Sequence, residues 1–212
     1  MQNHKLYKVW SQVPVAYYQK GVKQNILQYI WHSHKIKLAS KILSKLNFRN
    51  CLDVGCASGY MISEIAKIYP NCKYFGIDSY DQAIDYAKKN YPNIEFKAAS
   101  ADNLPFKNDS FDLVLFYETI EHVENPQDCL KEISRILKKN GTLILTMDSG
   151  SKLFRLVWFI WERTKGKIWQ GAHLHPFHHS GLEELIKNSG FSIRNKLLSF
   201  LNMEVTFILN KK

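Results

Sequence analysis

The sequence lacks several features that would set it apart from ordinary globular proteins. Only four of its 212 residues are cysteine and none are spaced as Cys-x-x-Cys, so we expect reduced thiols in the core. The longest apolar run, residues 156–161, is far shorter than the roughly 20 residues of a membrane-spanning helix. Residues 1–5 lead into no apolar signal segment. We therefore expect a cytoplasmic protein with a single domain, residues 1–212.

Acidic residues are missing from one end of the chain. Residues 1–50 hold nine Lys or Arg and no Asp or Glu, residues 51–150 hold ten against fifteen, and residues 151–212 hold ten against four. The net charge of +10 therefore lies at the two ends. An acidic middle suits a cationic ligand, and basic flanks suit an anionic substrate, a nucleic acid or a lipid headgroup surface. Solvated lysines on ordinary helix faces would give the same totals.

The strongest positive signal is an apolar run that ends at Asp53 and is followed by a turn of small residues and a helical pattern. The turn consists of Gly55, Cys56, Ala57, Ser58 and Gly59. Such residues let backbone N–H groups and a helix N-terminus approach a ligand closely. A second apolar run ends at Asp78, where a carboxylate can hold both hydroxyls of a ribose. Close packing of a strand on a helix would also favour a small-residue turn.

This turn resembles the first motif of the class I S-adenosylmethionine-dependent methyltransferases, which reads acid, apolar residue, then Gly-x-Gly-x-Gly. Ala57 stands at the middle glycine, and the third glycine of a dinucleotide fingerprint is absent. The resemblance implies S-adenosylmethionine as cofactor, with Asp53 ordering the loop and Asp78 binding ribose. The cofactor-binding residues expected from it are Asp53, Gly55, Cys56, Ala57, Gly59, Asp78, Ser79, Ser100, Ala101, Asp102 and Tyr117.

The rest of the chain alternates strand and helix patterns, which predicts an α/β fold with a largely parallel sheet. Strands are expected at the run before Gly55 and at residues 73–78, 94–98, 111–116, 142–147, 191–193 and 205–209. The family likeness, which runs from about residue 45 to the end, implies a Rossmann-like three-layer sandwich. Its seven-stranded, mostly parallel sheet would have helices on both faces and an antiparallel last strand.

Local signals predict where several helices begin and end. Residues 1–46 read as an N-terminal arm, irregular to about residue 20 and with one or two helices beyond it, interrupted near His32 and His34. Capping boxes are expected at residues 79–82 and 180–183, and a helix is expected to start at Asn125–Pro126 and stop at residues 138–141. His32 and His34 are expected on a polar helix face.

Polar residues that follow the third strand are candidates for the adenine contact. Residues 99–106 resemble the family segment Gly-Asp-Ala-Glu-x-Leu-Pro-Phe, with Ser100 in place of the acid that takes the adenine amino group. A hydroxyl still accepts a hydrogen bond. A polar turn without ligand contact is the alternative for Ser100 and Asp102.

The segment after the fourth strand carries the candidate catalytic residues. On a helical turn, Glu118, Glu121 and His122 would share one side, facing the methyl group. The pattern Glu-x-x-Glu-His resembles the ubiquinone-biosynthesis O-methyltransferases and the small-RNA ribose methyltransferases, and in the latter two Glu and two His hold a divalent metal. His175 is the candidate for the later His. A metal site, a metal-free general base and plain loop residues remain open.

Residues 150–172 form an insertion that is least like the family. Its aromatic residues are Phe154, Trp158, Phe159, Trp161 and Trp169, and its basic residues include Lys152, Arg155, Arg163, Lys165 and Lys167. This segment could cover the substrate side, rest on an anionic membrane or stack on unpaired bases, and a docked helix would show the same apolar stripe.

Together these features predict an enzyme that moves a methyl group from S-adenosylmethionine to an oxygen or nitrogen of a small-molecule or lipid-linked acceptor. The charge and the Glu-x-x-Glu-His pattern keep an RNA methyltransferase as an alternative, and a non-catalytic cofactor-binding protein is a third. The predicted location is the cytoplasm, with peripheral contact at an anionic membrane.

Overall fold

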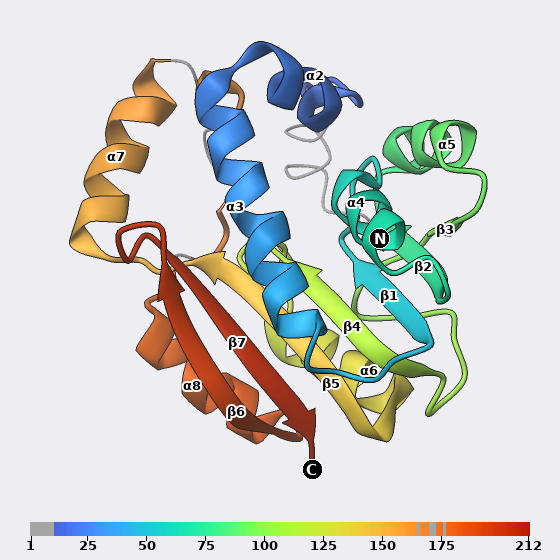
Figure 1. Ribbon diagram of the computed structural model, residues 1–212. Helices are drawn as coiled ribbons and strands as arrows, with labels where there is room; N and C mark the ends of the chain where they lie inside the picture. The colour runs from blue at the N-terminus through green and yellow to red at the C-terminus, as the bar shows by residue number, and fades with distance from the viewer. Residues whose placement is uncertain (1–10, 165, 170–172, 176) are drawn as a thin grey trace.

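The computed structural model describes residues 11–164, 166–169, 173–175 and 177–212. Seven strands form one sheet in the order β3-β2-β1-β4-β5-β7-β6 (Figure 1). The strands are β1 (Asn50–Val54), β2 (Lys73–Asp78), β3 (Glu95–Ala98), β4 (Phe111–Tyr117), β5 (Leu137–Asp148), β6 (Phe191–Ser199) and β7 (Glu204–Lys211). β1 to β5 pair in parallel, and β7 is antiparallel to both β5 and β6. The predicted fold class is confirmed.

Helices cover both faces of this sheet (Figure 1). The elements are α2 (Tyr17–Gln24), α3 (Ile26–Leu43), α4 (Tyr60–Ile68), α5 (Asp81–Asn90), α6 (Pro126–Ile136), α7 (Lys152–Arg163), the 3₁₀ turn η1 (Lys167–Trp169) and α8 (His179–Asn188). Apolar residues of α3, α4 and α5 share one buried cluster with the sheet, and those of α6 and α8 share another. The molecule therefore has three layers.

Strand β4 shows why the central strands contain almost continuous apolar sequence. Its Leu113 and Leu115 belong to the cluster under α3, α4 and α5, whereas Val114 and Phe116 belong to the cluster under α6 and α8. Successive side chains of a strand point to opposite faces, so a strand covered on both sides must be apolar at every position. This burial places the carboxyl ends of β1 and β4 side by side.

Two expected capping boxes are absent from the structure. Tyr80 precedes α5 without a side-chain cap bond, because Asp78 Oδ1 takes the Tyr80 N–H and Gln82 accepts from the Tyr80 hydroxyl. At α8 the cap is the ring of His178, which accepts from Ser180 N, and Glu183 binds Lys196 instead.

The end of α6 also differs from expectation. The helix begins at Pro126 as predicted but ends at Ile136, and residues 138–141 lie inside β5. Leu137 is fully buried and pairs with Phe111, which extends β5 along β4. Leu137 is thus buried as a strand residue, and the helix ends before the stop predicted at residues 138–141.

The N-terminal arm is more helical than expected. α2 already begins at Tyr17, and α3 runs unbroken through His32 and His34 after the Asn25 side chain caps its first turn. Tyr7 and Trp10 of the predicted arm lie outside the described residues. Among the described residues, the helices are all too short or too polar to traverse a bilayer.

Candidate active site

A cavity of about 1080 Å³ lies at the carboxyl ends of the parallel strands. In open parallel sheets, ligands bind outside the carboxyl ends of the strands, at the point where the strand order reverses. In this sheet the order reverses at β1, between β2 and β4. Its walls include the strand ends Val54, Asp78, Ala98 and Asp148, and Glu118 just beyond β4. Ligand cavities commonly measure roughly 300–1,000 Å³, so this one has room for a cofactor and a second molecule.

The small-residue loop forms one wall of the cavity and is held by β2. The carbonyl of Ile77 accepts from the backbone N–H groups of Gly55 and Cys56, and Asp78 Oδ2 accepts from Ala57 N at 2.8 Å. Ala57 has φ 45°, so the loop closes in a left-handed conformation. This arrangement presents backbone rather than side chains to the cavity.

Gly55 is required for two reasons. Its φ is +76°, and a Cβ built on it would lie 2.3 Å from Thr119 Oγ1. Thr119 is itself fixed, since its hydroxyl donates to the carbonyl of Tyr117. The loop after β4 therefore packs directly on the glycine loop.

The predicted adenine residues also line the cavity. Ser100 donates its hydroxyl hydrogen bond to Asp102, and both residues face the cavity with Ala101. The hydroxyl that replaces the family acid is thus held by a carboxylate two residues away. Ser79 lies beside Asp78 in the same wall.

Four expected cofactor residues lie just behind this wall. Asp53 and Cys56 are buried. Gly59 directly precedes α4 with φ +76°, and a Cβ built on it would meet Phe96. The fourth residue, Tyr117, packs on the cluster under α3. Burial raises the pKa of Asp53 well above its usual range, and the nearby Asp78 adds to the effect.

Glu118 does not share a helical face with the next two candidates. Its φ is 46°, the loop makes turns rather than a helix, and its carboxylate forms an ion pair with Lys35 of α3. Lys35 Nζ also lies 3.5 Å from Glu204 Oε2 at the start of β7. Burial opposes ionisation of Glu118, but the Lys35 ammonium outweighs it and lowers the Glu118 pKa.

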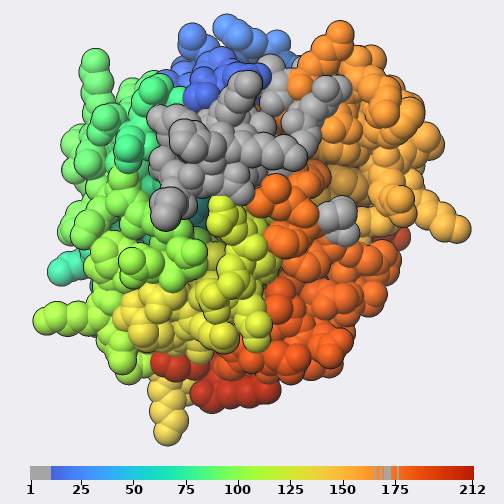
Figure 2. All heavy atoms as spheres, turned by 180° about the vertical axis from the view of Figure 1, so that it is seen from behind, coloured from blue at the N-terminus to red at the C-terminus, as the bar shows by residue number. Residues whose placement is uncertain are grey.

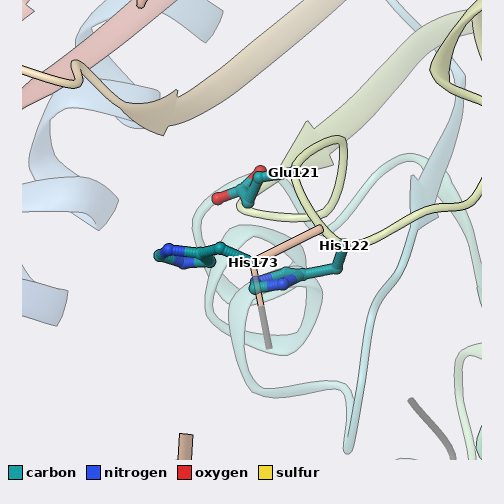
Figure 3. Close-up of side chains that lie close together, drawn as sticks. All are labelled: Glu121, His122 and His173. Carbon is teal, nitrogen blue, oxygen red and sulfur yellow. The ribbon is translucent and has the colours of Figure 1, made fainter. Parts of the chain in front are cut away.

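Glu121, His122 and His173 converge on the cavity (Figure 3). One ligand atom from each lies within 4.8 Å of the others. The His122 and His173 rings are 4.9 Å apart, and the His173 ring stacks on Trp158 at 4.6 Å. Glu121 is 2% exposed, and its Oε2 has no hydrogen-bond partner among the described atoms.

The predicted partner His175 lies apart from this cluster. The carbonyl of Glu121 accepts from Leu174 N and His175 N, which directs His173 toward the cavity. His175 Nε2 instead lies 3.3 Å from the Glu124 carbonyl, and its ring stacks on Phe177. The chain bends at Leu174, between the two His.

Asp148 completes the cluster from the end of β5. Its Oδ2 lies 3.9 Å from His173 Nε2, and its Oδ1 accepts from Gly150 N. Burial raises the pKa of Asp148 to about 7 and raises that of Glu121 well above its usual range. Burial also lowers the pKa of His173, so its ring is neutral and can accept a proton or a cation.

The opposite wall of the cavity is aromatic. It includes Tyr18, Trp31, Phe154, Trp158, Trp161, Trp169 and Phe200 from α2, α3, α7, η1 and the turn between β6 and β7. His32 also lines the cavity, with its ring 5.4 Å from that of Tyr18, and burial lowers its pKa to about 4. His32 thus differs from the expected polar helix face, since α3 turns this side inward.

Comparison with known proteins agrees with this geometry. Residues 52–145 match a family model described as a methyltransferase domain. The chain is 32% identical over 128 residues to the ubiquinone biosynthesis O-methyltransferase of Pelagibacter ubique, which covers 58% of this chain and 49% of that protein. It is 26% identical over 177 residues to the demethylmenaquinone methyltransferase of Chlorobaculum tepidum, covering 76% and 73%. The chain thus carries a methyltransferase domain and has the fold of an S-adenosylmethionine-dependent methyltransferase.

Solved structures with this fold match most of the length of this chain. An S-adenosylmethionine-dependent methyltransferase from Thermotoga maritima superimposes with a TM-score of 0.71 at 23% identity, covering 98% of this chain and 100% of the other. A cyclase also has this fold, with a TM-score of 0.67, 16% identity and coverage of 84% and 80%. The matches to the first two curated relatives span only 49% and 42% of their lengths. Fold alone therefore leaves the acceptor open.

Proposed function

We propose that the protein transfers the methyl group of S-adenosylmethionine to an oxygen of an acceptor that has an apolar body, either a small molecule or a lipid-linked one. The observation that supports this most is the shared cavity, which has a cofactor wall, an imidazole and carboxylate cluster, and an aromatic wall. Each wall suits a different part of the reaction. The quinone-pathway names of two relatives point to the same acceptor class.

The residues present fit the cofactor. The backbone of the loop at Gly55 and Ala57 can contact the methionine part, and Asp78 lies where both ribose hydroxyls would bind. Asp78 Oδ2 already accepts from Ala57 N, so ribose binding and loop conformation depend on the same carboxylate. When bound, the cofactor supplies an electrophilic methyl group on a sulfonium.

The acceptor oxygen must lose a proton as it attacks. We assign this step to the cluster of Glu121, His122 and His173, with His173 as the base and Asp148 beside it. The oxygen forms a bond to the methyl carbon, the carbon to sulfur bond breaks, and the neutral thioether S-adenosylhomocysteine is left. The protein contributes alignment and proton removal.

A divalent cation would fit the same cluster. Glu121 Oε2 is a buried carboxylate oxygen without a partner among the described atoms, and His122 and His173 supply nitrogen ligands near it. A cation there would lower the pKa of the acceptor hydroxyl. The predicted metal set changes, because Glu118 is paired with Lys35 and His175 lies apart.

The acceptor is found by incubating the protein with methyl-labelled S-adenosylmethionine and separate lipid, small-metabolite and RNA fractions. Label should enter a lipid or apolar metabolite. Transfer to RNA alone would contradict the acceptor class. Cofactor binding without transfer in any fraction would indicate a non-catalytic binding protein.

The roles in the cluster are tested by His173→Gln against His175→Gln. Loss of a general base typically costs about 10²–10⁴-fold in rate, so His173→Gln should lose most turnover while cofactor binding persists. His175→Gln is the matched control and should keep most of it. Equal effects would refute the assignment. A chelator that abolishes wild-type turnover, with recovery on adding magnesium or manganese, would identify the metal-assisted form.

A further inference from the structure

The exposed apolar side chains of this protein are concentrated around one cavity mouth. Among the described residues, all exposed large apolar side chains except Ile68 and Leu198 lie on α3, α7 or the turn between β6 and β7. They are Ile26, Leu27, Tyr29 and Ile30 on α3, Leu153, Leu156, Val157, Phe159 and Ile160 on α7, and Leu201 in the turn. We call this set the apolar rim.

Helix α7 is apolar on two sides. Phe154, Trp158 and Trp161 face the cavity, whereas Leu156 and Ile160 are 58% and 55% exposed. No residue of α7 is buried, and the helix projects at the edge of the molecule (Figures 1 and 2). A helix that only docks on a domain needs one apolar stripe. The outer stripe of α7 therefore has no partner among the described residues.

The tip of the β6–β7 turn adds a further exposed side chain to the rim. Phe200, Leu201 and Asn202 all have positive φ, between 51° and 62°. This conformation packs Phe200 on Trp31 of α3, with ring centroids 4.3 Å apart, and leaves Leu201 78% exposed. Such backbone strain persists only where the surroundings impose it.

Charge decides between partners for the apolar rim. Residues 11–49, which include α2 and α3, contain no acidic residue, and α7 carries Lys152, Arg155 and Arg163 against the single acid Glu162. Cations beside an exposed apolar helix face are typical of segments that lie in the interface of an anionic bilayer. Attraction between opposite charges alone would draw an acidic protein partner, but it would leave the exposed apolar side chains of the rim without a role.

The cavity opens between the two helices of the rim. Leu27 and Ile30 of α3 and Val157 of α7 line the cavity and are also exposed. We propose that the apolar rim docks on an anionic lipid bilayer, so that a lipid-linked acceptor enters the cavity between α3 and α7 without crossing water. This inference rests on the proposed function, because it supplies the partner of that same site.

The test is co-sedimentation of the full chain with vesicles of phosphatidylcholine alone or with phosphatidylglycerol. Binding should be stronger to the phosphatidylglycerol vesicles and should weaken as salt rises. Leu156→Ser with Ile160→Ser should lower binding by about tenfold or more, since both side chains would leave the acyl region. Ile68→Ser on α4 is the matched control, because Ile68 is 44% exposed but lies outside the rim.

Charge variants separate electrostatics from apolar burial. Lys152→Gln with Arg155→Gln should weaken binding to phosphatidylglycerol vesicles by roughly fivefold per cation, whereas Lys88→Gln with Lys89→Gln on α5 should not. Equal binding to both vesicle types, or equal loss in the Ile68 control, would overturn the proposal. A dimer in solution that Leu156→Ser abolishes would overturn it in favour of a contact between copies.

Failure of the docking surface can be told apart from failure of the methyl-transfer proposal. Leu156 and Ile160 do not line the cavity, so their variants should bind S-adenosylmethionine in calorimetry like the wild type. Intact cofactor binding and transfer to a detergent-dispersed acceptor, together with absent vesicle binding, would reject docking alone. Vesicle binding without transfer to any acceptor would reject the enzyme and leave the docking surface.

Discussion

Replacing Lys35 by methionine should destabilise the protein more than the same replacement of any other lysine in α3. Lys35 is 6% exposed, and its ammonium lies between Glu118 and Glu204. Removing one partner of a buried ion pair typically costs about 3–5 kcal/mol. Glu204 is 1% exposed, but the Glu118 side chain is 36% exposed and is screened by solvent. We therefore expect a loss of about 3 kcal/mol, at the lower end of that range.

The assay is thermal and urea unfolding with Lys37→Met as the matched control. A loss of about 3 kcal/mol corresponds to a Tm lower by about 6–12 °C in a chain of this size. Lys37 lies two residues away on the exposed side of α3, so its replacement should change Tm little. Adding Glu204→Gln to Lys35→Met should restore part of the loss, because the unpaired carboxylate is then gone.

The pH dependence of the Lys35→Met effect has a defined sign. In the wild type the Glu118 pKa is lowered below its usual 4.5, so Glu118 contributes stability above that pH and loses it in acid. Burial raises the Glu204 pKa despite Lys35, and without Lys35 it should rise further, which destabilises the variant as pH rises. The stability difference should therefore grow from about pH 4.5 upward. A pH-independent difference, or equal losses for Lys35→Met and Lys37→Met, would refute this account.

Three further changes test the walls of the cavity. Gly55→Ala should destabilise the loop by about 1–3 kcal/mol, since the new Cβ meets Thr119 at positive φ, and chemical unfolding measures it; an unchanged midpoint would contradict it. Asp78→Ala should weaken cofactor binding by roughly 1–3 kcal/mol in calorimetry, and wild-type affinity in this variant would remove the ribose assignment. Trp158→Leu should raise KM for an apolar acceptor with cofactor affinity unchanged; the reverse pattern would move Trp158 to the cofactor side.

The structure brings several of the predicted cofactor-binding residues to one cavity, because they are close together in the sequence. The loop from Gly55 to Gly59 follows its strand directly, and Asp78 closes the next strand, so one topological rule places both at the same edge. Asp148 closes β5 in the same way. Applying the rule to every strand end would have identified it.

The acceptor side depended on contacts that sequence spacing does not encode. Glu118 was expected on a helical turn, but the structure shows a left-handed residue held by Lys35, 83 positions earlier in the chain. The choice between His173 and His175 depends on two hydrogen bonds to the Glu121 carbonyl. Both contacts join residues far apart in the sequence, so motif spacing could not show that Glu118 pairs with Lys35 or that His173, not His175, lies beside Glu121 and His122.

The distribution of charge connects these observations to the reaction. The described lining of the cavity includes Asp78, Asp102, Glu118, Glu121 and Asp148 but no Lys or Arg, while the chain as a whole carries +10. An acidic, partly desolvated cavity favours a sulfonium cation and disfavours phosphates. Methyl transfer removes the positive charge of the sulfonium. An acidic cavity therefore attracts the neutral thioether product less strongly than it attracts the donor.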